Sequence, residues 1–90
     1  MSRVYITHRQ EFVLRTLALF TVEHGYPPTL RELMPLIGVK STNGVNDHLA
    51  ALERKGLIAR IPKVSRGLLL NDAGRTWIAQ QNILRASLND

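Results

Sequence analysis

A cluster of hydrogen-bonding side chains opens the segment KSTNGVNDHLAALERKG, residues 40–56. Asn can bond bidentately to adenine and Asp can accept from the cytosine amino group, so both residue types can read base edges. On a helix that turns 100° per residue, Asn43, Asn46 and Asp47 lie within about 100° of one another. A glycine beside this face would permit close approach of the backbone, at a cost of about 1 kcal/mol in helix propensity. The pattern predicts base readout by Asn43, Gly44, Asn46 and Asp47.

Positive charge is concentrated in the same part of the chain. Residues 40–66 hold six of the twelve Lys and Arg residues and only two acids, whereas the other 63 residues hold six basic and five acidic residues. A localised basic patch indicates a polyanionic partner, most often nucleic acid. Free N–H groups at a helix start can also hold a phosphate. The predicted phosphate contacts are Lys40, Ser41, Arg54, Lys55, Lys63 and Arg66.

Two plainer interpretations stay open at this level. Asn and Gly are common in the cap region of any helix, and a basic surface can simply be solvated. Asp47 favours base readout, because a carboxylate on a contact face repels phosphate, unless it turns away and pairs with Arg54.

Other chemistry is not indicated. The 90 residues suit one small domain, and the absence of cysteine excludes disulfides and thiolate-bound zinc. The three histidines do not fall at metal-ligand spacing, and no nucleophile, paired carboxylates or phosphate-binding glycine loop is present. No apolar run approaches the roughly 20 residues of a membrane span. We expect a cytoplasmic protein that is not an enzyme and needs no cofactor, metal or membrane.

Capping signals and apolar spacing predict three helices before a hairpin. T-x-x-Q at Thr7 and T-x-x-E at Thr29 are capping boxes, and Ser41 is a plausible N-cap. The helices should run from Thr7 to about Glu23, from Thr29 to Gly38 and from Ser41 to Lys55. Their predicted core residues are Phe12, Val13, Leu17 and Phe20, then Leu33, Leu36 and Ile37, then Val45, Leu49 and Leu52.

Residues 57–61 and 68–70 read as strands of a hairpin with a basic tip, and a last helix should run from Asn71 or Asp72 to about Leu88. The predicted fold is mainly α, a winged helix-turn-helix over residues 1–70 with a C-terminal helix over 71–90. That helix could pack on the core or form a dimer seam. A homodimer is favoured because two half-sites add their binding energies. The apolar residues concerned are Trp77, Ile78, Ile83, Leu84 and Leu88.

The stretches GYPPTLREL, STNGVNDHLAALERKGLI and SRG together resemble the N-terminal DNA-binding domain of LexA, the bacterial SOS repressor, over residues 7–70. The resemblance implies that the third helix reads the major groove. It places Ser41, Asn43, Gly44, Asn46 and Asp47 at recognition positions, and Lys63, Ser65 and Arg66 at or beside wing positions that approach phosphate. Here Asn46 and Asp47 replace two glutamates and Gly44 replaces an alanine, so the expected target differs from the usual LexA site.

LexA also carries a second domain with a Ser/Lys self-cleavage dyad, which the 20 residues after Leu70 cannot hold. Instead, LLLNDAGRTWI resembles the segment after the wing of MarR-like regulators. We therefore expect no autoproteolysis in this chain. The sequence predicts a sequence-specific, double-stranded DNA-binding transcriptional regulator, a repressor from a bacterium or phage. The alternatives are a winged-helix protein-interaction module and the DNA-binding part of a replication or partition protein of a mobile element.

Overall fold

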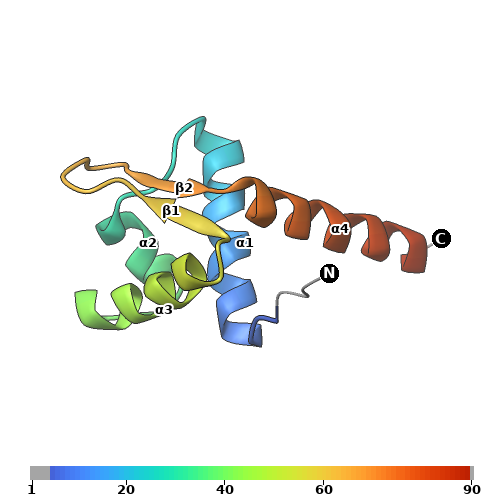
Figure 1. Cartoon of the computed structure of the whole chain (residues 1–90), viewed down its shortest axis with the longest axis horizontal. Helices are drawn as coiled ribbons and strands as arrows, with labels where there is room; N and C mark the ends of the chain where they lie inside the picture. The colour runs from blue at the N-terminus through green and yellow to red at the C-terminus, as the bar shows by residue number, and fades with distance from the viewer. Residues whose placement is uncertain (1–4, 90) are drawn as a thin grey trace.

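The computed structural model describes the backbone of residues 5–89 and the side chains of residues 5–81. In chain order its elements are α1 (His8–His24), α2 (Leu30–Leu36), α3 (Thr42–Arg54), β1 (Ile58–Arg60), β2 (Leu68–Leu70) and α4 (Asp72–Asn89). This order confirms the predicted winged helix-turn-helix, with the β1–β2 hairpin as the wing (Figure 1).

Both predicted capping boxes are formed. Thr7 Oγ1 accepts from the Gln10 backbone N–H at 3.1 Å, and Gln10 Oε1 accepts from the Thr7 N–H at 3.1 Å. Thr29 and Glu32 repeat the arrangement at the start of α2, with distances of 3.1 and 2.9 Å. Each box satisfies N–H groups that the first turn of a helix leaves without partners, which explains why both helices begin where the sequence predicts.

The core lies where the three helices meet the base of the wing. The predicted stripe of α3 is confirmed, since Val45, Leu49 and Leu52 have no exposed surface. The complete cluster of buried residues is Val13, Leu14, Leu17, Leu33, Ile37, Val45, Leu49, Leu52, Leu57, Ile58 and Leu68.

The prediction of the core is wrong at two residues, which are exposed. Phe12 is 44% exposed because it lies about 140° around α1 from the central core residue Leu17. Leu14, which the sequence analysis left out, fills the stripe instead. Leu36 is 49% exposed because α2 ends there, and Leu33 with the C-cap residue Ile37 makes the core contact.

The wing is a short antiparallel hairpin. Ile58 pairs with Leu70 and Arg60 with Leu68. β1 is shorter than the predicted strand because the Leu57 N–H donates back to the α3 carbonyl of Leu52, at 3.1 Å.

The last helix begins at Asp72, and the Asn71 carbonyl accepts from the Arg75 N–H at 3.0 Å. Trp77 and Ile78 are partly buried against the core. The predicted seam residues Ile83, Leu84 and Leu88 lie outside the side chains that the structure describes. Figure 1 shows α4 projecting on the side of the molecule opposite the wing tip and the N-terminal end of α3. The division into residues 1–70 and 71–90 stays a prediction.

Candidate nucleic-acid interface

The outer face of α3 is polar at its N-terminal end. Ser41 caps the helix, and its Oγ accepts from the Gly44 N–H at 3.1 Å. Asn43 and Asp47 are exposed, and within residues 5–81 their side chains have no hydrogen-bond or ion-pair partner. The pairing of Asp47 with Arg54, which the sequence left open, is therefore not formed. Both base-reading candidates are free to meet a ligand.

Gly44 faces the protein rather than the open side of α3. A Cβ built on Gly44 would lie 2.8 Å from Val39 Cγ1 and 3.3 Å from Ser41 Oγ. The space that a side chain would fill is thus taken by the turn between α2 and α3. Close packing against this turn explains why a residue without a side chain stands at position 44. The predicted role of Gly44 in base readout stays a prediction, and it concerns only the approach of the backbone.

Asn46 is half-buried and has a partner in the wing. Arg60 Nη2 of β1 donates to Asn46 Oδ1 at 2.9 Å. This contact joins the predicted reading helix to the base of the wing. Arg60 is one of the six basic residues of the segment 40–66 and was not among the predicted site residues.

The predicted phosphate-contacting residues differ in what they touch. Lys55 is half-buried, and its Nζ donates to Gln10 Oε1 at 2.5 Å, which ties the C-terminal end of α3 to α1. The other predicted members outside Arg66 are exposed, namely Lys40, Ser41, Arg54, Lys63 and Ser65. Their phosphate roles stay predictions.

Lys63 and Gly67 determine the backbone conformation at the tip of the wing. Lys63 adopts a left-handed conformation, with φ 64°. Gly67 cannot carry a side chain, because its Cβ would lie 2.5 Å from the Ile61 carbonyl oxygen. The Ile61 N–H donates to the Gly67 carbonyl at 2.7 Å and closes the tip. Lys63 and Ser65 are held exposed on this closed turn.

Arg66 is held by the protein. Its Nη1 donates to Glu32 Oε1 at 2.7 Å and to the Pro27 carbonyl at 2.8 Å, and its Nη2 donates to Glu32 Oε2 at 3.2 Å. The guanidinium also lies over the Tyr26 ring, 4.3 Å from its centroid. We call this set the wing latch, formed by Tyr26, Pro27, Glu32 and Arg66. A forked, two-point pair fixes geometry better than a single contact, so the latch orients the wing against the start of α2.

The latch also shifts the titration of its acid. Hydrogen bonds from Arg66 and then from the Thr29 N–H lower the pKa of Glu32 from an ordinary 4.5 to about 2. The predicted phosphate contact of Arg66 is untested, but a phosphate would compete with a carboxylate that already holds the guanidinium.

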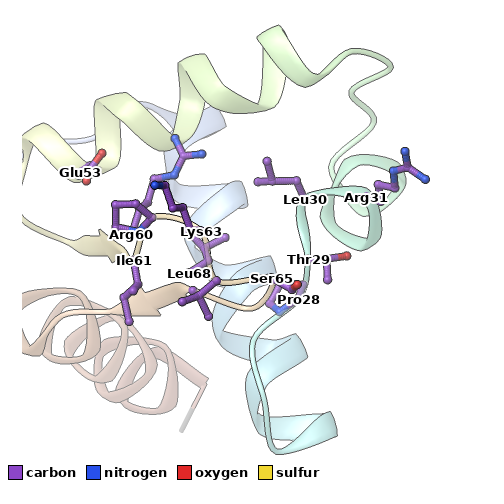
Figure 2. A pocket seen from close by; sticks show the side chains of 13 residues that line it. Pro28, Thr29, Leu30, Arg31, Glu53, Arg60, Ile61, Lys63, Ser65 and Leu68 are labelled. Carbon is purple, nitrogen blue, oxygen red and sulfur yellow. The ribbon is translucent and has the colours of Figure 1, made fainter.

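An open groove of about 680 Å³ lies between the wing, the start of α2 and the end of α3 (Figure 2). Three cations line it, Arg31, Arg60 and Lys63, together with one acid, Glu53. Ser65 of the wing and Thr29 at the start of α2 also line it. A concave surface with excess positive charge and hydroxyl donors suits a phosphate backbone.

Sequence reasoning gave no site role to three of these residues, Thr29, Arg31 and Arg60. Arg31 lies outside the basic segment and contributes to the groove only through the packing of α2, and Figure 2 shows its guanidinium pointing away from Lys63 and Arg60. Arg60 could have been singled out from its place in the strand that leads into the wing.

Within residues 5–81, His, Asp and Glu side chains form no group able to hold a metal ion. No helix in the described part of the chain has the length and apolar character needed to cross a membrane.

The geometry agrees with a comparison against known families. The family model for the LexA DNA-binding domain matches residues 4–67. The chain belongs to the LexA DNA-binding domain family. This is a DNA-binding regulator domain rather than an enzyme fold, and the match extends from before α1 to the far side of the wing tip.

Curated relatives support the LexA assignment. The LexA repressor of Anaeromyxobacter dehalogenans (strain 2CP-1) is 53% identical over 70 residues, which cover 78% of this chain and 31% of that protein. The LexA repressor of Geotalea uraniireducens is 49% identical over 82 residues, covering 90% and 41%. That of Cellvibrio japonicus is 44% identical over 90 residues, covering 87% and 45%. The chain spans less than half the length of these LexA relatives.

Proposed function

We propose that this chain is a sequence-specific, double-stranded DNA-binding transcriptional regulator, a LexA-like repressor from a bacterium or phage. The supporting observation is that Asn43 and Asp47 are exposed in the first turns of α3, and that the N-terminal end of α3 and the wing tip lie on the same side of the molecule (Figure 1). A B-DNA major groove, about 12 Å wide, admits one α-helix. With α3 in that groove, the wing and the start of α2 would face the adjacent phosphates.

In this proposal the roles divide by chemistry. Asn43, Asn46 and Asp47 contact base edges, which carry sequence information, while exposed cations fix position on the backbone. Lys63 and Arg31 line the groove and are the leading candidates for phosphate contacts. Both lie outside the three ion pairs found among the described residues.

Selection from random duplexes tests the proposal directly. We expect one enriched motif, together with non-specific binding that weakens steeply between low and physiological salt. Asn43→Ala should cost about 1–3 kcal/mol on the enriched site and little on random DNA. Equal losses on all sequences would remove Asn43 from base readout, and no DNA binding at low salt would refute the proposed function.

A protein-interaction module is the second candidate, favoured by one feature. Leu19 and Val22 of α1 are 58% and 82% exposed and line a shallow groove with Ile78 of α4. This apolar face lies on helices other than the reading helix. It would become the leading candidate for a binding surface if the protein bound no DNA at low salt.

A further inference from the structure

The three polar residues of α3 that are proposed to contact bases are not equivalent. Asn43 and Asp47 are exposed and without partners in the described part of the chain, whereas Asn46 is half-buried and bonded to Arg60. A free Asn presents an acceptor and a donor side by side, which is the pattern that matches adenine N6 and N7. Asn46 does not have this freedom.

The chemistry of arginine decides which way the Asn46 amide points. A guanidinium carries five N–H donors and no acceptor. The amide atom 2.9 Å from Arg60 Nη2 must therefore be the oxygen, because an amide NH₂ in that place would put donor against donor. This settles an orientation that coordinates of an amide often leave open. With Oδ1 accepting from Arg60, the donor group Nδ2 is the end of the amide that has no partner in the described part of the chain.

Arg60 adds donors of its own to the same place. It is half-buried, lines the groove under α3 and takes part in no ion pair among the described residues (Figure 2). The backbone of Arg60 pairs with Leu68 of β2, so the position of Arg60 in the wing is fixed by the hairpin. Arg60 and Asn46 together therefore present several N–H groups and a positive charge, and the one acceptor oxygen between them already accepts from Arg60.

We propose that Arg60 is a specificity-determining residue, which holds Asn46 with its donor end outward so that the pair selects guanine at one position of the target. Guanine offers two acceptors in the major groove, N7 and O6, whereas adenine sets its N6 amino donor beside N7. Adenine would place that amino group against the donors of the pair. This inference rests on the proposed function, because it requires α3 to lie in the major groove.

The test compares base preferences in selections from random duplexes, followed by competition between guanine and adenine at the position that Asn46→Ala affects. Wild type should prefer guanine there by about tenfold, the size of one good base contact. Arg60→Met keeps the apolar stem and removes the donors, so that one position should lose its preference or move toward adenine while the rest of the motif is kept.

Asn46→Asp gives an independent test. A carboxylate still accepts from Arg60 but has no donor for guanine, and it can accept from the cytosine amino group. The preferred pair at that position should then change from G·C to C·G. Gln80→Ala, at an exposed position of α4 on the side opposite the wing tip, is the control and should leave the motif unchanged. Thermal unfolding of each variant checks that the fold is kept.

The outcomes separate the two claims. A wild-type motif with adenine at the Asn46 position, or an unchanged motif in both Arg60→Met and Asn46→Asp, overturns the role of Arg60 and leaves the proposed function standing. A uniform loss across all positions in a folded Arg60→Met protein also overturns it. The absence of any enriched motif for wild type refutes the proposed function and this inference together.

Discussion

Lys63 and Arg66 stand three residues apart in the wing, yet their charges have different surroundings. Lys63 is exposed at the tip and has no ion-pair partner in the described residues. Arg66 is held by both oxygens of Glu32 and by the Pro27 carbonyl. Only the first cation can neutralise a phosphate without first giving up a carboxylate. The two side chains should therefore affect DNA binding through different physical routes.

We predict that Lys63→Asn weakens binding to every duplex and reduces the slope of log K against log salt by about 0.9, the value for one lost phosphate contact. Asn is chosen because it tolerates the left-handed backbone of this position. Arg66→Gln should lower the free energy of unfolding and weaken binding while it leaves the salt slope unchanged. Salt titrations by fluorescence anisotropy and urea unfolding measure these quantities.

Arg66 would be a phosphate contact after all if Arg66→Gln reduced the salt slope as much as Lys63→Asn does and left the free energy of unfolding unchanged. Lys40→Gln provides a further exposed cation for comparison outside the wing.

At the residue scale, the sequence predicted which side chains are exposed better than it predicted their partners. The turn of 100° per residue was enough to put Asn43 and Asp47 on the open face of α3. The contacts of Arg66 with Glu32 and of Arg60 with Asn46 join residues 34 and 14 positions apart. Such contacts depend on how the elements pack, and counting charges along the chain cannot reveal them.

At the scale of elements, the wing latch couples the hairpin to the first turn of α2 through one acid. Glu32 accepts from Arg66 and also closes the capping box with Thr29. Its pKa is lower in the folded protein, about 2, than the ordinary 4.5. The folded state therefore binds fewer protons at this site, and the stabilisation is full above about pH 4.5 and is lost as pH falls toward 2.

We predict that Glu32→Gln lowers the free energy of unfolding at neutral pH, and that the difference from wild type shrinks between about pH 4.5 and pH 2. Gln keeps an acceptor for the Thr29 N–H and loses the charge that holds Arg66. Urea unfolding followed by circular dichroism at several pH values measures the effect. Glu23→Gln, an exposed acid of α1 outside the latch, is the control. A difference that stays constant down to pH 2 would contradict the role of the ion pair.

The start of α4 depends on a glycine. A Cβ on Gly74 would lie 2.2 Å from the Leu57 carbonyl oxygen, a backbone atom that cannot move aside cheaply. We predict that Gly74→Ala destabilises the protein by about 1–3 kcal/mol, although alanine is the better helix former. Because Trp77 is the only tryptophan and packs one turn further along, its fluorescence should shift to the red.

Ala79→Gly, exposed in the same helix, is the matched control for the glycine effect. It should cost no more than about 1 kcal/mol and leave the Trp77 emission unchanged. An equally stable Gly74→Ala protein with wild-type emission would show that α4 can move away from Leu57.

Element boundaries were predictable because the signals that set them are local. Capping boxes, apolar spacing and glycine stops lie within a few residues of each helix end. The errors come from contacts between elements. Phe12 was placed in the core because it is apolar, but the packing of α1 against α3 selects the face of Leu14. The strand β1 was predicted to begin one residue too early because the Leu57 N–H donates to Leu52 of α3, although the Leu57 carbonyl accepts from Asn71 after β2.

At the scale of the whole molecule, the proposed reading surface and α4 lie on opposite sides. Among the described side chains of α4, Trp77 and Ile78 pack on the body. In the sequence, Leu84 and Leu88 follow one turn apart in the later part of the helix, so they can share one face. A second copy joined there would leave both reading helices unobstructed. We therefore keep the homodimer as a proposal.

The final prediction concerns cooperativity on DNA. One reading helix contacts few base pairs, and two copies on half-sites about 34–36 Å apart add their binding energies. Leu84→Asp combined with Leu88→Asp should abolish cooperative binding to a duplex with two half-sites and leave binding to a single half-site unchanged. Gel shifts on both duplexes, with sedimentation of the free protein, measure this. The control pair is Thr76→Asp with Gln80→Asp, which adds the same charge at exposed positions of α4. Cooperativity retained in the leucine variant would place the dimer contact elsewhere, and cooperativity lost equally in the control would make added charge, rather than a lost apolar seam, the cause.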